Sequence, residues 1–292
     1  MEQVREHSRR QGESSTDFIR AATLAVEALV NTSDSGLEFS QEGFDARKMF
    51  AAFFFARTTR FLSATTLLAG VDHGIEAQAL LRLLIEDLIE VRYVASDPVE
   101  LAQRWLDHQD RTRYYAWTEQ FGSDHSLYTS EQIARMEALI DRDVQEARES
   151  VGDGNPDRIA GRILKRRWTN RTMLRRAQVA SRRFPDTVDH HVLYRMLCDA
   201  VHASAGLMND YLLLKDGRLT IRMRADGYKS TTVGVLAIHY VSLTMEALSE
   251  FGLTNAPDIA AIARPYIDLG AYSFEALMHE TAAYDNGETC EL

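Results

Sequence analysis

The segment "YRMLCDAVHASAGLMNDY", residues 194–211, brings an arginine, an aspartate and a histidine close together. At about 100° per residue, Arg195, Asp199 and His202 share a polar stripe of one helix, next to an apolar stripe that begins at Tyr194. An imidazole titrates near neutral pH, and a nearby carboxylate or guanidinium tunes its pKa. The spacing therefore predicts acid–base chemistry, with His202 and Arg195 as catalytic residues.

Two other interpretations of this stripe stay open. Asp199 and His202 have the i, i+3 spacing by which one helix supplies two metal ligands in carboxylate–histidine bundles. Such a site needs a second pair on another helix, and Asp107, His108 and Asp110 do not follow that pattern, so no metal and no cofactor is expected. Alternatively, His202 is a packing residue that is hydrogen-bonded to a neighbouring helix.

A second group of charges lies in the most apolar helix of the chain, predicted over residues 74–95. Arg82, Glu86 and Glu90 are spaced at four residues and share one stripe. The stripe either faces solvent with ordinary ion pairs, or it places Arg82 and Glu86 together in a buried polar pocket. A buried charge needs partners. Arg82 and Glu86 join His202 and Arg195 as predicted catalytic residues.

The charge distribution is uneven between residues 131 and 183. Residues 158–183 hold ten Lys and Arg and no acid, whereas residues 131–157 hold eight acids and three bases. A basic helix can follow phosphates, and a tryptophan can stack on a base. The predicted nucleic-acid contacts are Arg166, Arg167, Trp168, Arg171 and Arg175. The alternative is that the two segments pair as an electrostatically matched hairpin.

Apolar periodicity predicts an all-α fold, an irregular single-domain bundle of eight or nine helices with one short hairpin near residues 217–229. The predicted helices span residues 15–30, 44–68, 74–95, 98–121, 130–150, 156–183, 188–214, 230–251 and 257–283. The "LTIRMR" alternation of residues 219–224 carries the hairpin. We expect a disordered leader over residues 1–14, one domain over 15–283 and a flexible tail over 284–292.

Composition excludes several classes of protein. The chain has 292 residues, a net charge of −10 and 45% hydrophobic residues, which is typical of a soluble protein and argues against a globally basic nucleic-acid binder. Two cysteines give no disulfide framework, so a cytoplasmic location is expected. Arg57 and Arg60 interrupt the apolar run of residues 49–70, so that run predicts a buried helix rather than a membrane span.

The runs "LLRLLIEDLIEVRYVASDP", "KRRWTNRTM" and "LYRMLCDAVHAS" resemble a bacterial helical family, domain-of-unknown-function family 5677. The resemblance covers roughly residues 50–215. It points to Arg82, Glu86, Trp168, Tyr194, His202 and Ser204, and it implies that Tyr194 is a further catalytic residue. Cys198 stands near the place where the family pattern has a serine. The family supplies no established activity.

A looser resemblance is to the HEPN class of helical ribonucleases, whose site is an arginine and a histidine on one helix with four to six residues between them. Arg195 and His202 fit that pattern. The resemblance implies a metal-independent ribonuclease in defence or stress, with RNA as partner and a homodimer in which two half-sites meet. The alternatives are a non-enzymatic binding or oligomerisation module and a carboxylate–histidine metalloenzyme.

Overall fold

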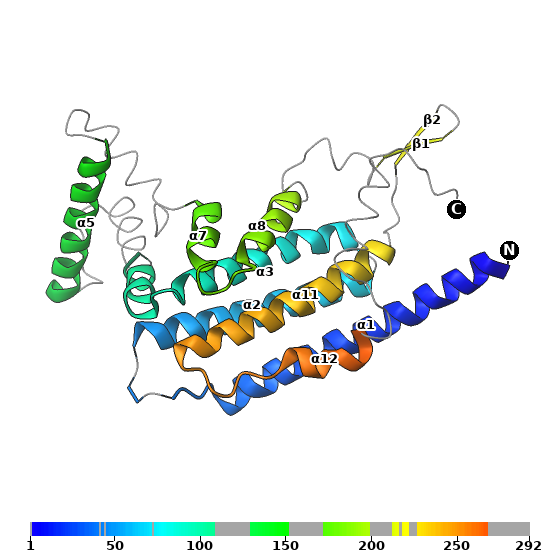
Figure 1. The fold of residues 1–292 in the computed structure, drawn as a ribbon, viewed down its shortest axis with the longest axis horizontal. Helices are drawn as coiled ribbons and strands as arrows, with labels where there is room; N and C mark the ends of the chain where they lie inside the picture. The colour runs from blue at the N-terminus through cyan, green and yellow to red at the C-terminus, as the bar shows by residue number, and fades with distance from the viewer. Residues whose placement is uncertain are drawn as a thin grey trace. The chain divides into compact units, whose positions relative to one another are not determined.

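Long apolar runs with few prolines and glycines give the chain its helices, most of which begin close to where the sequence predicts (Figure 1). The computed structural model describes residues 2–40, 42–43, 45–71, 73–108, 129–151, 172–198, 212–215, 218–221 and 227–267. The helices are α1 (Glu2–Ser35), α2 (Ala46–Gly70), α3 (Gly74–Val94), α5 (Ser130–Val151), α7 (Met173–Ala180), α8 (Thr187–Met196), α11 (Gly227–Leu248), the 3-10 helix η2 (Ser249–Phe251) and α12 (Ile259–Ile267). Residues 98–108 are also helical. The all-α prediction is confirmed.

Several predicted boundaries differ from those of the structure. Helix α1 starts at Glu2 rather than at Ser15, because Glu, Gln and Arg are good helix formers and continue the helix through the preceding residues. Helix α7 ends at Ala180 rather than at residue 183, and turns follow. The helix predicted over 188–214 was wrong at its end, since residues 212–214 belong to a strand.

The hairpin begins earlier than residues 217–229, since its first strand precedes this range and only its second strand lies within it. Strand β1 (Leu212–Lys215) pairs antiparallel with β2 (Arg218–Ile221), with Leu212 opposite Ile221 and Lys215 opposite Arg218. Only two residues, Asp and Gly in the sequence, separate the strands. That dipeptide is the strongest short hairpin signal, and it outweighs the helical pattern of the preceding leucines.

Packing groups the chain into two compact units, one of residues 1–43, 51–96 and 173–292, the other of residues 44–50 and 97–172. Compact packing alone does not show that a unit folds independently. The division into a leader, one domain and a tail therefore stays a prediction.

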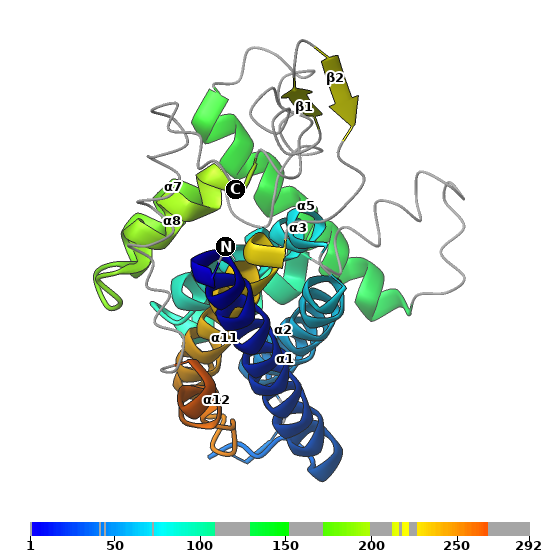
Figure 2. The same cartoon turned by 90° about the vertical axis from the view of Figure 1, so that its right-hand side faces the viewer.

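In the first unit, α3 is the central helix. It packs against α11, α7 and α8, and its second half from Leu84 to Val94 is buried at almost every position. Helices α1 and α12 lie beside α11 (Figure 2). Gly234 of α11 allows the closest approach to α1, since a Cβ at this position would lie 1.8 Å from the ring of Phe18. The absence of a side chain there lets the two helices meet.

The segment after α1 binds the segment between η2 and α12. Ser40 N donates to the carbonyl of Gly252 at 2.8 Å, and Thr254 N donates to the carbonyl of Glu38 at 2.9 Å. Phe39 and Leu253 form an isolated β-bridge between these two bonds. Gly252 has φ of 83°, a left-handed conformation that favours glycine. The end of α1 is thereby held to residues more than 200 positions away in the sequence.

In the second unit, the helical stretch 98–108 is held by an aromatic and an ionic contact. Trp105 meets Phe50 edge-to-face with ring centroids 5.1 Å apart. Asp107 accepts a hydrogen bond from Arg135 of α5 at 2.9 Å. The acidic helix α5 thus uses one of its arginines to bind this aspartate. The predicted pairing of residues 131–157 with 158–183 lies largely outside the described residues.

Candidate functional site

Helix α8 follows α7 after a tight turn. Pro185 has no amide hydrogen, so a continuous helix through α7 and α8 is disfavoured there. Thr187 closes the turn, because its amide and its hydroxyl both donate to the carbonyl of Phe184, at 3.1 and 2.7 Å. Thr187, Leu193 and Tyr194 are the buried residues of α8. The burial of these three side chains sets the rotation of α8 about its axis, and therefore the direction in which its other side chains project.

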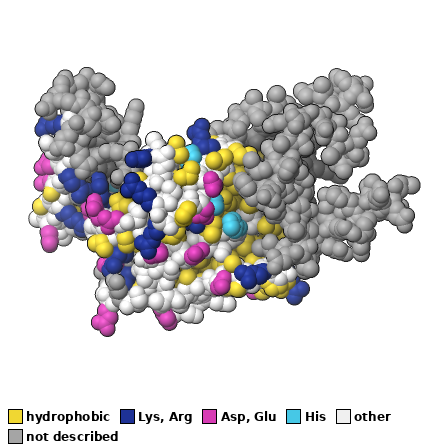
Figure 3. Space-filling model, in the orientation of Figure 1, with side chains coloured by type: hydrophobic (Ala, Val, Ile, Leu, Met, Phe, Trp, Pro, Cys, Tyr) yellow, Lys and Arg dark blue, Asp and Glu magenta, His cyan; other side chains and the backbone are white. Residues whose placement is uncertain are grey.

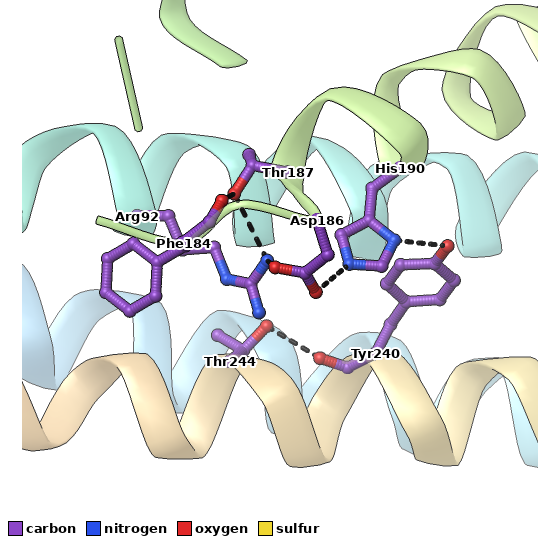
Figure 4. A network of polar contacts seen from close by, with 7 residues as sticks. All are labelled: Arg92, Phe184, Asp186, Thr187, His190, Tyr240 and Thr244. Carbon is purple, nitrogen blue, oxygen red and sulfur yellow. Dashed lines mark hydrogen bonds and ion pairs between the residues drawn. The ribbon is translucent and has the colours of Figure 1, made fainter. Parts of the chain in front are cut away.

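A polar network joins three elements at the start of α8 (Figure 4). Arg92 of α3 donates through Nη1 to Asp186 Oδ1 at 2.8 Å and to Thr187 Oγ1 at 3.2 Å. The other oxygen of Asp186 lies 2.8 Å from His190 Nε2. His190 Nδ1 lies 3.2 Å from the hydroxyl of Tyr240 on α11. The network therefore connects α3, α8 and α11.

The electrostatics of the network fix where its protons are. Burial raises the pKa of Asp186, but the hydrogen bond from His190 and the charge of Arg92 outweigh burial and leave it below its usual value. Desolvation, assisted by Arg92 and opposed by Asp186, lowers the pKa of His190. Burial raises the pKa of Tyr240, which therefore stays a phenol. The neutral imidazole then carries its proton on Nε2, donates to the carboxylate and accepts from Tyr240.

This arrangement is better suited to fixing α8 in place than to catalysis. Tyr240 is buried, and both oxygens of Asp186 are occupied by Arg92 and His190. The exposed His239 of α11 is the only further imidazole in ring contact with His190 among the described residues, at 6.5 Å between centroids. Within the same described ranges, no three His, Cys, Asp or Glu side chains form a metal-binding group.

A second cluster surrounds Tyr194 near the end of α8. Arg82 of α3 donates to the hydroxyl of Tyr194 at 2.8 Å, and its guanidinium carbon lies 4.7 Å from the centroid of the tyrosine ring. Glu86 lies 3.5 Å from Arg82. The thiol of Cys198 donates to the carbonyl of Tyr194 at 3.3 Å. Burial and the charge of Glu86 raise the pKa of Tyr194, with Arg82 acting in the opposite direction.

The structure thus brings together three of the predicted catalytic residues, Arg82, Glu86 and Tyr194. Arg82 is mostly buried, with a side chain 14% exposed, and Glu86 is 30% exposed, so their ion pair is only partly buried. Arg195 is exposed on the opposite side of α8 from the buried face. His202 lies outside the described residues, as do Asp199 and Ser204.

Of the predicted nucleic-acid contacts, Arg175 is exposed on α7, where it donates to Gln178 at 3.1 Å. The other four, Arg166, Arg167, Trp168 and Arg171, lie outside the described residues.

Sequence reasoning missed several of the charges on α3. Glu90 is buried and forms an ion pair with the buried Arg176 of α7, so the solvent-facing interpretation of the stripe was wrong at this position. Asp87 is buried and accepts from Arg57 of α2 at 2.9 and 3.0 Å. Desolvation raises the pKa of Asp87 to about 7 against the opposing charge of Arg57.

The signal for these pairs is the composition of α3. A helix that is apolar on almost every face is surrounded by protein, so each charge on it needs a protein partner. That signal marks Asp87, Glu90 and Arg92 as paired residues, without identifying their partners.

The fold and these clusters define an all-α protein in which the charges of one buried helix hold the helices around it. The chain belongs to the family of unknown function DUF5677, whose model matches residues 48–219. This confirms the family resemblance seen over residues 50–215. No curated protein and no solved structure matches the chain.

One apolar segment, Thr232–Phe251, is long and apolar enough to cross a membrane by length and composition. This is weak evidence, since 61% of its most apolar window is buried inside the protein and the core helix of a soluble protein passes the same test. Its contacts with α3, α1 and α12 through α11 account for its composition.

Proposed function

We propose that the protein is a metal-independent ribonuclease that acts in cellular defence or stress, with Arg195 and His202 as its catalytic pair. The supporting observation is that Arg195 is exposed on α8 while the neighbouring Tyr194 is buried and held by Arg82. A fixed helix with an outward guanidinium can present a planar fork to a phosphate. His202 is seven positions further along the chain.

The proposed chemistry is an internal transfer at phosphorus. His202 accepts the proton of a ribose 2′-hydroxyl, and the 2′-oxygen attacks the adjacent phosphorus. The bond to the 5′-oxygen of the next nucleotide breaks, and that oxygen takes the proton back from the imidazolium. The products are a 2′,3′-cyclic phosphate and a free 5′-hydroxyl. Arg195 stabilises the added negative charge on the phosphate oxygens.

The exposed positive charges on α7, on α8 and in the turn between them favour an RNA substrate. Arg175, Arg182 and Arg195 are exposed, and Figure 3 shows Lys and Arg side chains on the face that these helices present. The homodimer and the cytoplasmic location belong to the same proposal, since a second copy would supply a second Arg–His pair.

The test is cleavage of single-stranded RNA in excess chelator by the wild type and three variants, with each melting temperature measured alongside. His202→Ala should abolish cleavage and leave the melting temperature nearly unchanged, and Arg195→Lys should be almost as harmful. Asp199→Asn should still cleave, because the chemistry needs no metal ligand. Cleavage that survives His202→Ala ends this proposal.

A second candidate function is a non-enzymatic binding module. The contacts of Arg82 with Tyr194 and Glu86 favour it, because a guanidinium engaged on both sides has a structural role without any substrate. In that case no RNA is cleaved, and His202→Ala lowers the melting temperature through lost packing.

A further inference from the structure

The outer face of α8 carries four side chains that form one surface. His191, Val192, Arg195 and Met196 have the spacing i, i+1, i+4, i+5, which places them on two adjacent stripes of a helix. Val192 is 51% exposed and Met196 is 38% exposed, and their spacing of four residues places the two apolar side chains side by side on the helix surface. Arg195 is exposed as well. The surface is therefore apolar along one stripe and basic along the other.

The imidazole of His191 is held in a defined orientation. Its ring stacks on the ring of Tyr194, with centroids 5.7 Å apart and an angle of 29° between the planes. Tyr194 is itself buried and fixed by its hydrogen bond from Arg82. A ring stacked in this way keeps its nitrogen-bearing edge available, and it loses little conformational freedom when a ligand binds.

Arg195 lies close enough to influence His191. Partial burial, followed by the charge of Arg195, lowers the pKa of His191. The imidazole is therefore neutral at neutral pH and can donate one hydrogen bond beside a permanent cation.

We propose that the outer face of α8 binds one nucleotide unit of a single-stranded RNA, with Arg195 and His191 on the phosphate and Val192 and Met196 against the base. The RNA identity of the ligand rests on the proposed function above. A guanidinium can bind both non-bridging oxygens of a phosphodiester at once, and each of these oxygens can accept a further hydrogen bond, from the imidazole N–H. A base offers a flat, weakly polar face to the two exposed apolar side chains.

Charge selects this ligand over an apolar peptide. Arg195 is an exposed cation that a phosphate backbone would neutralise. The exposed carboxylate on this helix is Asp189, which precedes Arg195 by six residues and so lies about 9 Å along the axis from it. The phosphate therefore binds at the C-terminal end of α8, away from Asp189.

The test measures binding separately from cleavage. The probe is a short fluorescein-labelled single-stranded RNA with 2′-O-methyl groups, which cannot be cut through its 2′-oxygens. Binding is followed by fluorescence anisotropy over a range of salt concentrations and pH. Arg195→Ala should weaken binding about tenfold and reduce the salt slope by about one. Val192→Ser combined with Met196→Ser should weaken binding by a similar factor without changing the salt slope.

His191→Asn supplies a readout that a structural role would not affect. In the wild type, binding should strengthen as the pH falls below about 6.5, since protonated His191 adds a cation to the phosphate contact. In the described part of the chain, Tyr194 stacks on this imidazole and Arg195 is the charge that acts on it. Arg82 of α3 binds the same tyrosine and pairs with Glu86. The Asn variant keeps a side-chain donor but should lose the pH response. Asp189→Asn should strengthen binding slightly at every pH.

The control is Arg182→Ala, which removes an exposed cation of the α7–α8 turn outside this face. Its effect should be less than twofold. A loss equal to that of Arg195→Ala would show nonspecific attraction only, and it would overturn the inference. A wild-type protein that does not bind the probe would also overturn it.

The two proposals fail separately. If the wild type cleaves unmodified RNA but His191→Asn and the serine pair bind the probe as the wild type does, the nucleotide site is wrong and the ribonuclease stands. If these variants lose binding and no RNA is ever cleaved, the nucleotide site stands and the ribonuclease is wrong.

Discussion

Arg92 and Asp186 are 94 residues apart in the sequence, and their charged atoms lie 2.8 Å apart. The arginine is buried in the middle of the protein, whereas the aspartate is half exposed in the turn before α8. The pair anchors the start of α8 to α3. Other charges of α3 act in the same way on other helices, Asp87 on α2 and Glu90 on α7.

Glu90→Gln should lower the free energy of unfolding by about 3–5 kcal/mol. The substitution leaves the guanidinium of Arg176 buried beside a neutral amide, and a buried charge that loses its partner is strongly destabilising. Urea unfolding followed by circular dichroism measures the change. The control is Glu100→Gln, whose ion pair with Arg104 is exposed and should be worth less than about 1 kcal/mol. Equal effects in the two variants would mean that the Glu90–Arg176 pair is not a buried contact in solution.

His190→Gln should make the stability less dependent on pH under mildly acidic conditions. The folded-state pKa of His190 lies below the unfolded value of about 6.5, so the unfolded chain binds more protons between the two values. In the wild type, the contribution of His190 to the free energy of unfolding is therefore fully present above about pH 6.5. It is lost as the pH falls through the pKa that His190 has in the folded protein. Glutamine keeps hydrogen-bonding groups and removes the titration.

The measurement is urea unfolding of the wild type and His190→Gln at a series of pH values between about 7 and 4.5. The difference between the two proteins should change steadily in favour of the variant as the pH falls. A difference that stays constant with pH would contradict the neutral, buried state of His190.

Asp87→Asn should change the pH dependence of stability in the opposite direction to His190→Gln. The pKa of Asp87 is about 7 in the folded protein and 3.8 in its ordinary state, so the folded chain binds more protons in that interval. Stability from this residue is present below about pH 3.8 and is lost as the pH rises through 7. Relative to the wild type, the Asn variant should gain stability as the pH rises from about 4 to 7.

The same titration of Arg57→Gln provides the comparison for Asp87. Arg57 opposes the raised pKa of Asp87, so its removal should move the window of lost stability to higher pH. An Asp87→Asn variant whose stability parallels the wild type across the whole range would show that the carboxyl is solvated in the native state.

Gly234→Ala should destabilise the protein by about 1–3 kcal/mol, although alanine favours a helix. The added methyl group would lie 1.8 Å from the ring of Phe18, so this buried ring would have to leave its place between α1 and α11. The matched control is Gly70→Ala, because a Cβ at that position meets only Ile19, at 4.0 Å. Thermal unfolding distinguishes the two, and a variant at 234 as stable as the control would disprove the close approach.

Periodicity predicted the helices well because each one buries a continuous apolar stripe, and α3 was placed within one residue of its observed bounds. The pairing of Arg82 with Glu86 also followed from spacing along one helix. The partners of Asp87, Glu90 and Arg92 could not be predicted in this way. They come from α2, α7 and the turn before α8, and only the packed fold brings those residues together.

Asp186 and His190 are the clearest example of residues whose contacts could not be predicted from the sequence. In the sequence, Phe184, Pro185 and Asp186 indicate a turn and nothing more. Their importance arises because the turn lies against Arg92 and Tyr240, which belong to helices far away in the chain.

The contacts of α1 set an order of events during synthesis. In the described part of the chain, α1 packs mainly against α11 and α12, which begin at residue 227 or later, and Phe39 bridges to Leu253. While the ribosome makes the intervening residues, the side of α1 that packs against α11 and α12 has nothing to cover it. The cost of closing so large a loop makes this docking a slow, late step in folding. Until that step, the nascent chain exposes a helix suited to capture by a chaperone.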